Sequence, residues 1–149
     1  MLVIDDFAHH PTAVRETIAG IRLRYPGRRL WAVFEPRSNT SRRNIHQREY
    51  QSAFDLADRV VIRLPEPHDK VPVDQQLDVG AIVRAISARG IGAAAIEDVG
   101  GIAVLLARDL TKGDVVLVMS NGAFGGLIPR LQSALHAGAE SGAAGQPAR

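Results

Sequence analysis

The sequence predicts an α/β domain with a Rossmann-like, mostly parallel sheet of about five to six strands and helices on both faces. Three observations indicate this fold. Short β-rich runs alternate with segments of helical periodicity, which is the pattern of parallel strands joined by crossover helices. Residues 115–119 are apolar without interruption, as expected of a strand covered on both faces. Polar clusters follow several strands, and open α/β folds bind ligands at the carboxyl ends of their strands.

Five strands and five helices are expected in strict alternation. Pro11 suits the first turn of a helix, where its missing N–H removes no hydrogen bond, and Asp98 is placed to cap a later helix. Val14 and Ile18 give the first helix a buried stripe because they recur at helical spacing. The strands are expected at residues 2–5, 30–34, 59–64, 91–96 and 115–119, and the helices begin near Pro11, Asn44, Val79, Val99 and Leu127.

Two segments carry more specific expectations. The second helix is predicted over residues 44–57, with Ile45, Phe54 and Ala57 facing the core. Residues 137–149 are mostly Ala, Gly, Ser and Pro, so we expect a disordered tail after a domain that ends near residue 136.

Length and composition exclude several classes of protein. A chain of 149 residues suits one domain, and the absence of cysteine removes thiolate chemistry, disulfides and zinc–cysteine sites. No apolar run approaches the roughly 20 residues that span a bilayer, and the N-terminus lacks a signal pattern, so we expect a cytoplasmic protein without a membrane partner. An aromatic content of 5% and a net charge of +2 argue against a nucleic-acid partner.

The first polar cluster, residues 5–11, lies at a predicted strand-to-helix turn. Asp6 and His9 are its candidate ligand residues, because a carboxylate accepts hydrogen bonds from ribose hydroxyls and an imidazole near a helix N-terminus donates to phosphate. The alternative is that Asp6 caps the turn and the histidines are surface residues. No metal site is expected, because the adjacent His9 and His10 cannot both reach one ion easily and no third ligand is suggested.

The second cluster, residues 34–43, leaves a buried strand and is dense in hydrogen-bond donors. Arg37 follows the strand directly, and its planar fork can bind two oxygens of a carboxylate or phosphate. Arg42 is a second candidate in the same loop. Two alternatives stay open: the arginines form a solvated face, and Asn39, Thr40 or Ser41 serves only to cap the next helix.

The third cluster, residues 120–126, is rich in glycine and precedes the last helix. Its backbone N–H groups could face an anion, or the glycines could serve a tight turn. The chain contains neither G-x-x-x-x-G-K-[ST] nor G-x-G-x-x-G, so it has no phosphate-cradling loop of its own.

The three clusters resemble motifs of a known family. Residues 4–12 read I-D-D-F-A-H-H-P-T and are similar to the D-[DY]-[YF]-[AG]-H-x-P signature that opens the C-terminal domain of the Mur ligases, the ATP-dependent amide-forming enzymes of peptidoglycan precursor synthesis. Residues 34–40 and 120–126 look most like the members that add a preformed tripeptide. The resemblance covers about residues 1–136.

The resemblance implies that the chain is the third domain of a three-domain ligase and is inactive alone. In this family the N-terminal domain holds the UDP-sugar, and the central domain binds ATP and Mg²⁺. We expect both of these domains to lie outside this chain. ATP would phosphorylate the carboxylate of UDP-N-acetylmuramate, and the free amine of L-Ala-γ-D-Glu-meso-diaminopimelate would attack the acyl phosphate. The C-terminal domain closes over these sites and brings the incoming peptide, in a pathway of peptidoglycan recycling.

Carried over by motif, the resemblance gives roles to single residues. Asp6 would contact the nucleotide ribose, and His9 would lie beside the nucleotide. Arg37 and Arg42 would orient carboxylates of the incoming peptide, while Ser120 and Asn121 would line its pocket. A D-N-P-R loop that binds diaminopimelate in one relative is missing here, so the resemblance assigns no contact to that group. Other readings are a ligase that adds L-alanine, a free-standing nucleotide- or anion-binding module, and a structural domain.

Overall fold

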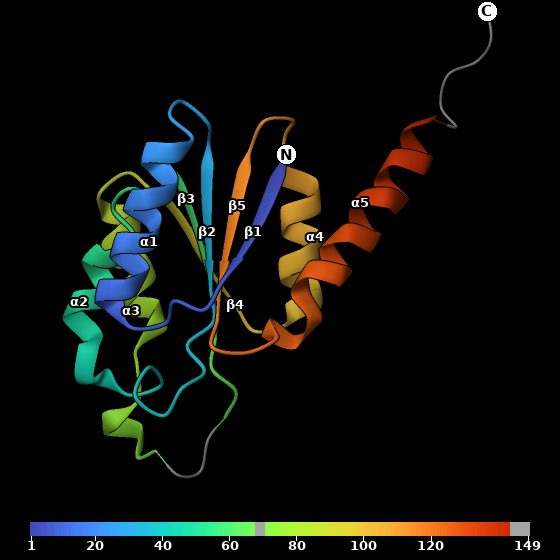
Figure 1. The fold of residues 1–149 in the computed structure, drawn as a ribbon. Coiled ribbons are helices and arrows are strands. Elements are labelled where there is room, and N and C mark those ends of the chain that lie inside the picture. Colours follow the sequence, from blue (N-terminus) through green and yellow to red (C-terminus); the bar gives the residue numbers. More distant parts are fainter. Residues whose placement is uncertain (68–70, 144–149) are drawn as a thin grey trace, which may run out of the picture.

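The computed structural model of the chain describes residues 1–67 and 71–143 (Figure 1). Five parallel strands form one sheet in the order β1-β5-β2-β3-β4. The strands are β1 (Leu2–Asp6), β2 (Leu30–Phe34), β3 (Arg59–Arg63), β4 (Gly92–Ile96) and β5 (Val115–Met119). The helices are α1 (Pro11–Arg24), α2 (Gln47–Ala53), α3 (Val79–Ala88), α4 (Val99–Asp109) and α5 (Leu127–Ala143), with short 3₁₀ turns at Asn44–His46, Val73–Gln75 and Phe124–Gly126. The predicted fold class is confirmed.

The last strand in sequence, β5, lies between β1 and β2. Val115 of β5 pairs with Leu2 on one side and with Leu30 on the other. All five residues of β5 are buried, as the uninterrupted apolar run predicts.

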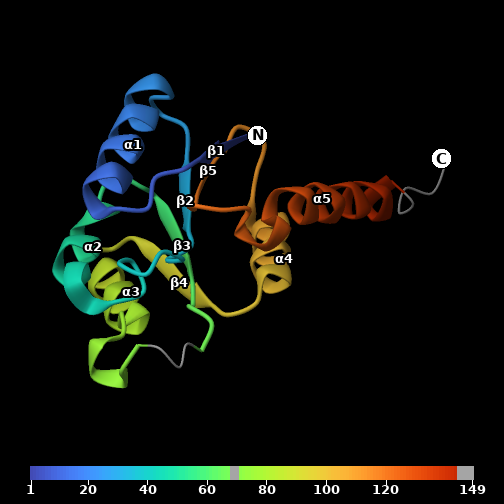
Figure 2. The same ribbon diagram turned by 60° about the horizontal axis from the view of Figure 1, so that its bottom comes forward.

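Helices cover both faces of the sheet, with α1, α2 and α3 on one face and α4 and α5 on the other (Figures 1 and 2). Successive side chains of a strand point to opposite faces, so β2 contributes to two separate cores. Leu30, Ala32 and Phe34 pack in the core under α1, α2 and α3. Trp31 and Val33 pack in the core under α4 and α5.

The helix starts follow from local chemistry. His10 caps α1 by accepting a hydrogen bond from the Thr12 N–H at 3.3 Å, and Pro11 occupies the first helical position. Asp98 caps α4 by accepting from the Gly101 N–H at 2.6 Å, as predicted.

Two sequence predictions need correction. The second helix begins at Gln47, not at Asn44, and Ile45 is 60% exposed in the preceding 3₁₀ turn; Phe54 and Ala57 are buried, just beyond the helix. The prediction of disorder from residue 137 is wrong for residues 137–143, which continue α5 because alanine is a strong helix former; residues 144–149 lie outside the described part of the chain. The end of α5 projects beyond the sheet (Figure 1).

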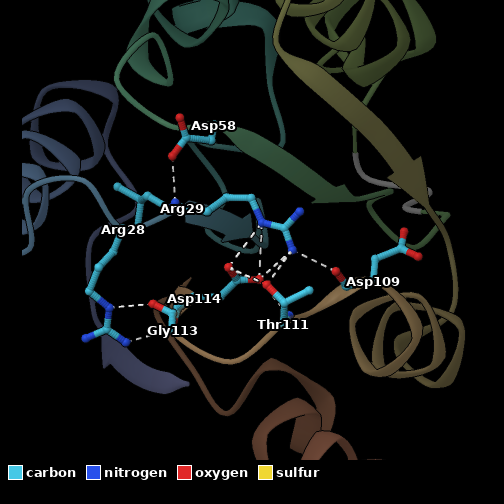
Figure 3. A network of polar contacts seen from close by, with 8 residues as sticks. Arg28, Arg29, Asp58, Asp109, Thr111, Gly113 and Asp114 are labelled. Carbon is cyan, nitrogen blue, oxygen red and sulfur yellow. Dashed lines mark hydrogen bonds and ion pairs between the residues drawn. The ribbon is translucent and has the colours of Figure 1, made fainter.

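A polar network closes the amino end of the sheet (Figure 3). The buried carboxylate of Asp114 accepts hydrogen bonds from Nε and Nη2 of Arg29, the shortest at 2.6 Å from Nη2, and a further bond at 2.9 Å from the Thr111 N–H. Arg29 also donates to the backbone carbonyl of Asp109 at 2.8 Å. The network therefore fastens the segment before β2 to the segment before β5.

Candidate active-site crevice

The strand order opens a crevice at the carboxyl ends of β1, β5 and β2. The helices that follow β1 and β2 lie on one face of the sheet, whereas α5, which follows β5, lies on the other (Figure 2). Neighbouring strands whose connections leave in opposite directions create the switch point at which open α/β sheets bind ligands. The three polar clusters predicted from the sequence follow these three strands.

Asp6 and His9 lie together in the turn between β1 and α1. One carboxylate oxygen of Asp6 accepts a hydrogen bond from the Ala8 N–H at 2.8 Å, so the side chain holds the turn. The second oxygen has no partner among the described residues. Nδ1 of His9 is 3.0 Å from the carbonyl oxygen of Phe7, and the Tyr50 hydroxyl donates to the carbonyl oxygen of His9. Burial raises the pKa of Tyr50, so its hydroxyl keeps the proton that it donates.

A buried carboxylate, Glu35, joins the ends of three strands. Its side chain is 5% exposed; one oxygen accepts from the Ser120 hydroxyl at 2.8 Å and the other from Nη1 of Arg63 at 2.5 Å. Arg63 also donates to the carboxylate of Glu66 at 2.9 Å. Both glutamates therefore pair with the same guanidinium, and the trio carries a net charge of −1.

Arg37 lies directly against the loop that follows β5. A Cβ atom added to Gly122 would be 1.8 Å from Nη1 of Arg37, so only a glycine leaves room for the guanidinium in this position. Within the described residues, the side chain of Arg37 has no hydrogen-bond or ion-pair partner. The crevice thus contains an exposed cation beside Gly122 with its donors free.

A cavity of about 400 Å³ lies beside these groups. Its lining includes Glu35, Arg37, Arg42, Arg63 and Glu66. Arg42, like Arg37, has a guanidinium without a partner among residues 1–67 and 71–143. The three arginines and two glutamates of the lining give it a net charge of +1. Since Arg63 is occupied by the two glutamates, Arg37 and Arg42 have the free donors, and the cavity suits an anionic ligand.

Ser120 and Asn121 lie next to this cavity but not on its surface. Ser120 is 2% exposed; its hydroxyl donates to Glu35 and accepts from the Gly122 N–H at 3.1 Å. Ser120 therefore positions the loop, and the structure does not expose it to a ligand. The Oδ1 atom of Asn121 is buried and has no hydrogen-bond donor in the described part of the chain.

The glycine-rich loop makes a tight turn. Phe124, Gly125 and Gly126 all have positive φ angles, and a Cβ atom at Gly125 would approach Cγ2 of Val99 to 2.8 Å. The Gly126 N–H donates to the Ala123 carbonyl oxygen at 3.0 Å. The backbone donors of Gly122 and Gly126 are thus used within the loop, which favours the turn over the anion-binding alternative.

The polar loop after β2 also differs from its prediction. Ser38 and Ser41 bond to each other, with the Ser41 N–H donating to Oγ of Ser38 at 3.0 Å, and they form a turn of their own. Helix α2 starts only at Gln47 and has no side-chain cap, so Asn39, Thr40 and Ser41 do not cap it.

Sequence reasoning missed the Glu35–Arg63 pair and Glu66. Each of the paired residues stands at the end of an otherwise apolar strand segment, and that position is the signal that could have found them. Among the described residues there is no group of three or more His, Asp or Glu side chains placed to hold a metal ion, and no helix there has the length and apolar character needed to cross a bilayer.

The fold and the crevice define a parallel α/β domain with a cationic cavity at the carboxyl edge of the sheet. Residues 1–122 match the family model described as Mur ligase, glutamate ligase domain. The chain belongs to the Mur ligase family, as the three motifs indicate.

Relatives with two different names are about equally similar to the chain. A UDP-N-acetylmuramate–L-alanyl-γ-D-glutamyl-meso-2,6-diaminoheptandioate ligase of Escherichia coli (strain K12) is 36% identical over 93% of this chain and 28% of its own length. A UDP-N-acetylmuramate–L-alanine ligase of Desulfitobacterium hafniense (strain Y51) is 35% identical over 81% of this chain and 27% of its own. The chain therefore spans less than a third of the length of these relatives.

One solved structure of a Mur-type ligase is similar to this chain in both fold and sequence. The murein peptide ligase of Psychrobacter arcticus 273-4 superimposes with a TM-score of 0.72 at 35% identity, over 89% of this chain and 27% of that protein. The chain is thus similar to a part of that ligase that makes up about a quarter of its length.

Proposed function

We propose that the chain is the peptide-binding C-terminal domain of an ATP-dependent ligase that joins L-Ala-γ-D-Glu-meso-diaminopimelate to UDP-N-acetylmuramate. The observation that supports it most is the cavity with two unpartnered guanidiniums, Arg37 and Arg42. A tripeptide with free carboxylates is matched by these cations. In the proposed reaction an acyl phosphate forms on the sugar carboxylate, and the peptide amine displaces phosphate from it. Such a reaction belongs in the cytoplasm, where ATP is available.

The turn between β1 and α1 fits the nucleoside part of ATP. Asp6 has one carboxylate oxygen available to accept a ribose hydroxyl, and His9 lies three residues further along the same turn. Phe7 is 68% exposed and its ring meets that of His9 edge to face, with centroids 5.5 Å apart. No cation lies in this turn, so the phosphates of ATP and the Mg²⁺ ion would be held by the central domain of the full-length ligase.

A ligation assay tests the assignment of Asp6 and His9. We expect that the chain, joined to its N-terminal and central domains, releases phosphate only when ATP, UDP-N-acetylmuramate and the tripeptide are all present. Asp6→Ala is expected to raise the KM for ATP about tenfold, which corresponds to one lost hydrogen bond to a charged group. His9→Ala is expected to act in the same direction. Unfolding midpoints close to wild type would show that the variants fold, and an unchanged KM in both would contradict the assignment.

The close contact between Gly122 and Arg37 allows a second test. Gly122→Ala is expected to displace the Arg37 guanidinium and to raise the KM for the tripeptide about tenfold, because the new Cβ occupies the position of Nη1. Gly122 has no positive φ, so alanine fits its backbone. The matched control is Gly20→Ala in α1, where an added Cβ meets no atom within 4 Å. Wild-type KM values in both Gly122→Ala and Arg37→Ala would remove Arg37 from the site.

The similarity to an L-alanine-adding relative favours one other candidate function. A ligase of that kind would use L-alanine in place of the tripeptide in the same assay. Tight nucleotide binding by the isolated chain, without reconstituted ligation, would instead favour a free-standing binding module.

A further inference from the structure

A second cavity continues the first one along the edge of the sheet. It has a volume of about 780 Å³ and lies over the ends of β3 and β4. The two cavities share a wall made of Arg42, Leu64, Pro65 and Glu66. In the strand order, β3 and β4 are the strands farthest from β1, which carries Asp6. The two cavities therefore form one trough that leads away from the turn between β1 and α1.

The charges in the second cavity are one free cation and one free anion. Glu66 is paired with Arg63. Asp78 caps α3 through a 2.8 Å hydrogen bond from the Ala81 N–H, and its other oxygen is 4.0 Å from Nη2 of Arg84. In the part of the chain that the structure describes, the Arg42 guanidinium and the Glu97 carboxylate have no partner. Such a pair matches a ligand that carries both a carboxylate and an ammonium group.

The remaining wall of the second cavity is largely aliphatic. Leu64, Val71, Leu77 and Val79 line it, and the last three are buried. A wall of this kind accommodates a short methylene chain, because apolar area of both partners is removed from water.

We propose that the second cavity binds the far end of the peptide, a zwitterionic amino-acid centre at the end of an aliphatic chain. The far carboxylate lies on Arg42 and the far ammonium on Glu97, while the carboxylate nearer the reacting amine lies on Arg37. This assignment rests on the proposed function, because the diaminoheptanedioate residue of the tripeptide has such an end. A single amino acid such as L-alanine fills the first cavity alone.

Chemical-shift mapping tests the location of the peptide. The ¹⁵N-labelled chain is titrated with L-Ala-γ-D-Glu-meso-diaminopimelate and with the dipeptide L-Ala-γ-D-Glu. We expect the tripeptide to shift amides around both cavities, including Leu77 and Glu97, and the dipeptide to shift only those around the first, including Arg37. Tripeptide shifts confined to the first cavity would overturn the second-cavity assignment and leave the proposed function intact. Absence of any shift at millimolar tripeptide would overturn both.

A charge variant tests the role of Glu97. Glu97→Gln is expected to weaken tripeptide binding about fivefold, the upper range for one exposed ion pair, and to leave dipeptide binding unchanged. A tripeptide that ends in L-lysine keeps the far ammonium but lacks the far carboxylate, so its affinity is expected to fall with Glu97→Gln but to be insensitive to Arg42→Ala.

The matched control is Glu16→Gln, because Glu16 is exposed on α1 and lines neither cavity. Equal losses in Glu97→Gln and Glu16→Gln, or equal losses for tripeptide and dipeptide, would overturn the assignment of the far ammonium.

Discussion

Replacing Glu35 by alanine is expected to lower the free energy of unfolding by about 3 kcal/mol, because it removes the buried partner of the Arg63 guanidinium. Arg63, with a side chain 17% exposed, then keeps only the exposed Glu66 as an ion-pair partner, and the buried Ser120 hydroxyl loses its acceptor. Urea denaturation followed by circular dichroism measures the change, with a constant slope showing that the unfolding transition is the same.

Glu66→Ala is the matched control for this prediction. Glu66 pairs with the same guanidinium, but it lies at the surface, so its removal is expected to cost less than about 1 kcal/mol. The double variant Glu35→Ala, Arg63→Met also removes the guanidinium that has lost its buried partner, and it is expected to recover part of the loss. Equal destabilisation by Glu35→Ala and Glu66→Ala would mean that burial of the pair contributes nothing.

Asp114→Ala is expected to lower the free energy of unfolding by roughly 2–3 kcal/mol. The substitution removes the acceptor of Arg29 and leaves the Thr111 N–H without its bond, at the amino end of the sheet. Thermal and urea unfolding report the loss. The matched control is Asp109→Ala, because the Asp109 side chain forms its hydrogen bonds with Arg108 at the surface and its backbone carbonyl still accepts from Arg29. That control is expected to unfold close to the wild type.

The same network predicts how stability depends on pH. Burial alone would raise the pKa of Asp114, but the hydrogen bonds from Arg29 and Thr111 and the charge of Arg29 outweigh it and hold the pKa below its ordinary value. The stabilisation is therefore complete above about pH 5 and is lost as the pH falls below about 4, toward the lowered pKa. Below pH 4 the stability of the wild type is expected to fall more steeply with acid than that of Asp114→Asn. Identical slopes would contradict the role of this carboxylate.

The elements that could be predicted are those with strong local signals. The run at Val115–Met119 needs two covered faces wherever it lies, and Pro11 and Asp98 mark helix starts through their own backbone chemistry. Ile45 was misplaced because the segment before α2 is shaped by distant contacts. Asn44 donates to the Asp74 carbonyl oxygen at 2.9 Å, and Arg43 bridges to Gln76, so tertiary contacts hold this segment in a 3₁₀ turn.

The location of the candidate site could be predicted from the sequence, but the contacts between its side chains could not. Arg37 and Arg42 were identified because they follow a buried strand, and the structure places both in one cavity. The Glu35–Arg63 pair depends on β2 and β3 being neighbours, and Ser120 reaches Glu35 only because β5 lies beside β2. No local pattern encodes that strand order, so the burial of Ser120 could not be predicted.

The position of β5 has a consequence for how the chain folds. Within the described sheet β1 hydrogen-bonds only to β5, so the first strand of this sheet to be synthesised has no partner until the last strand of the sheet follows it. β2, β3 and β4 are neighbours in both sequence and space and can assemble early, whereas docking of β1 requires closure of a loop that spans most of the chain. The turn that carries Asp6 and His9 is thus completed late in folding, and a chain that ends before β5 leaves that turn without its sheet.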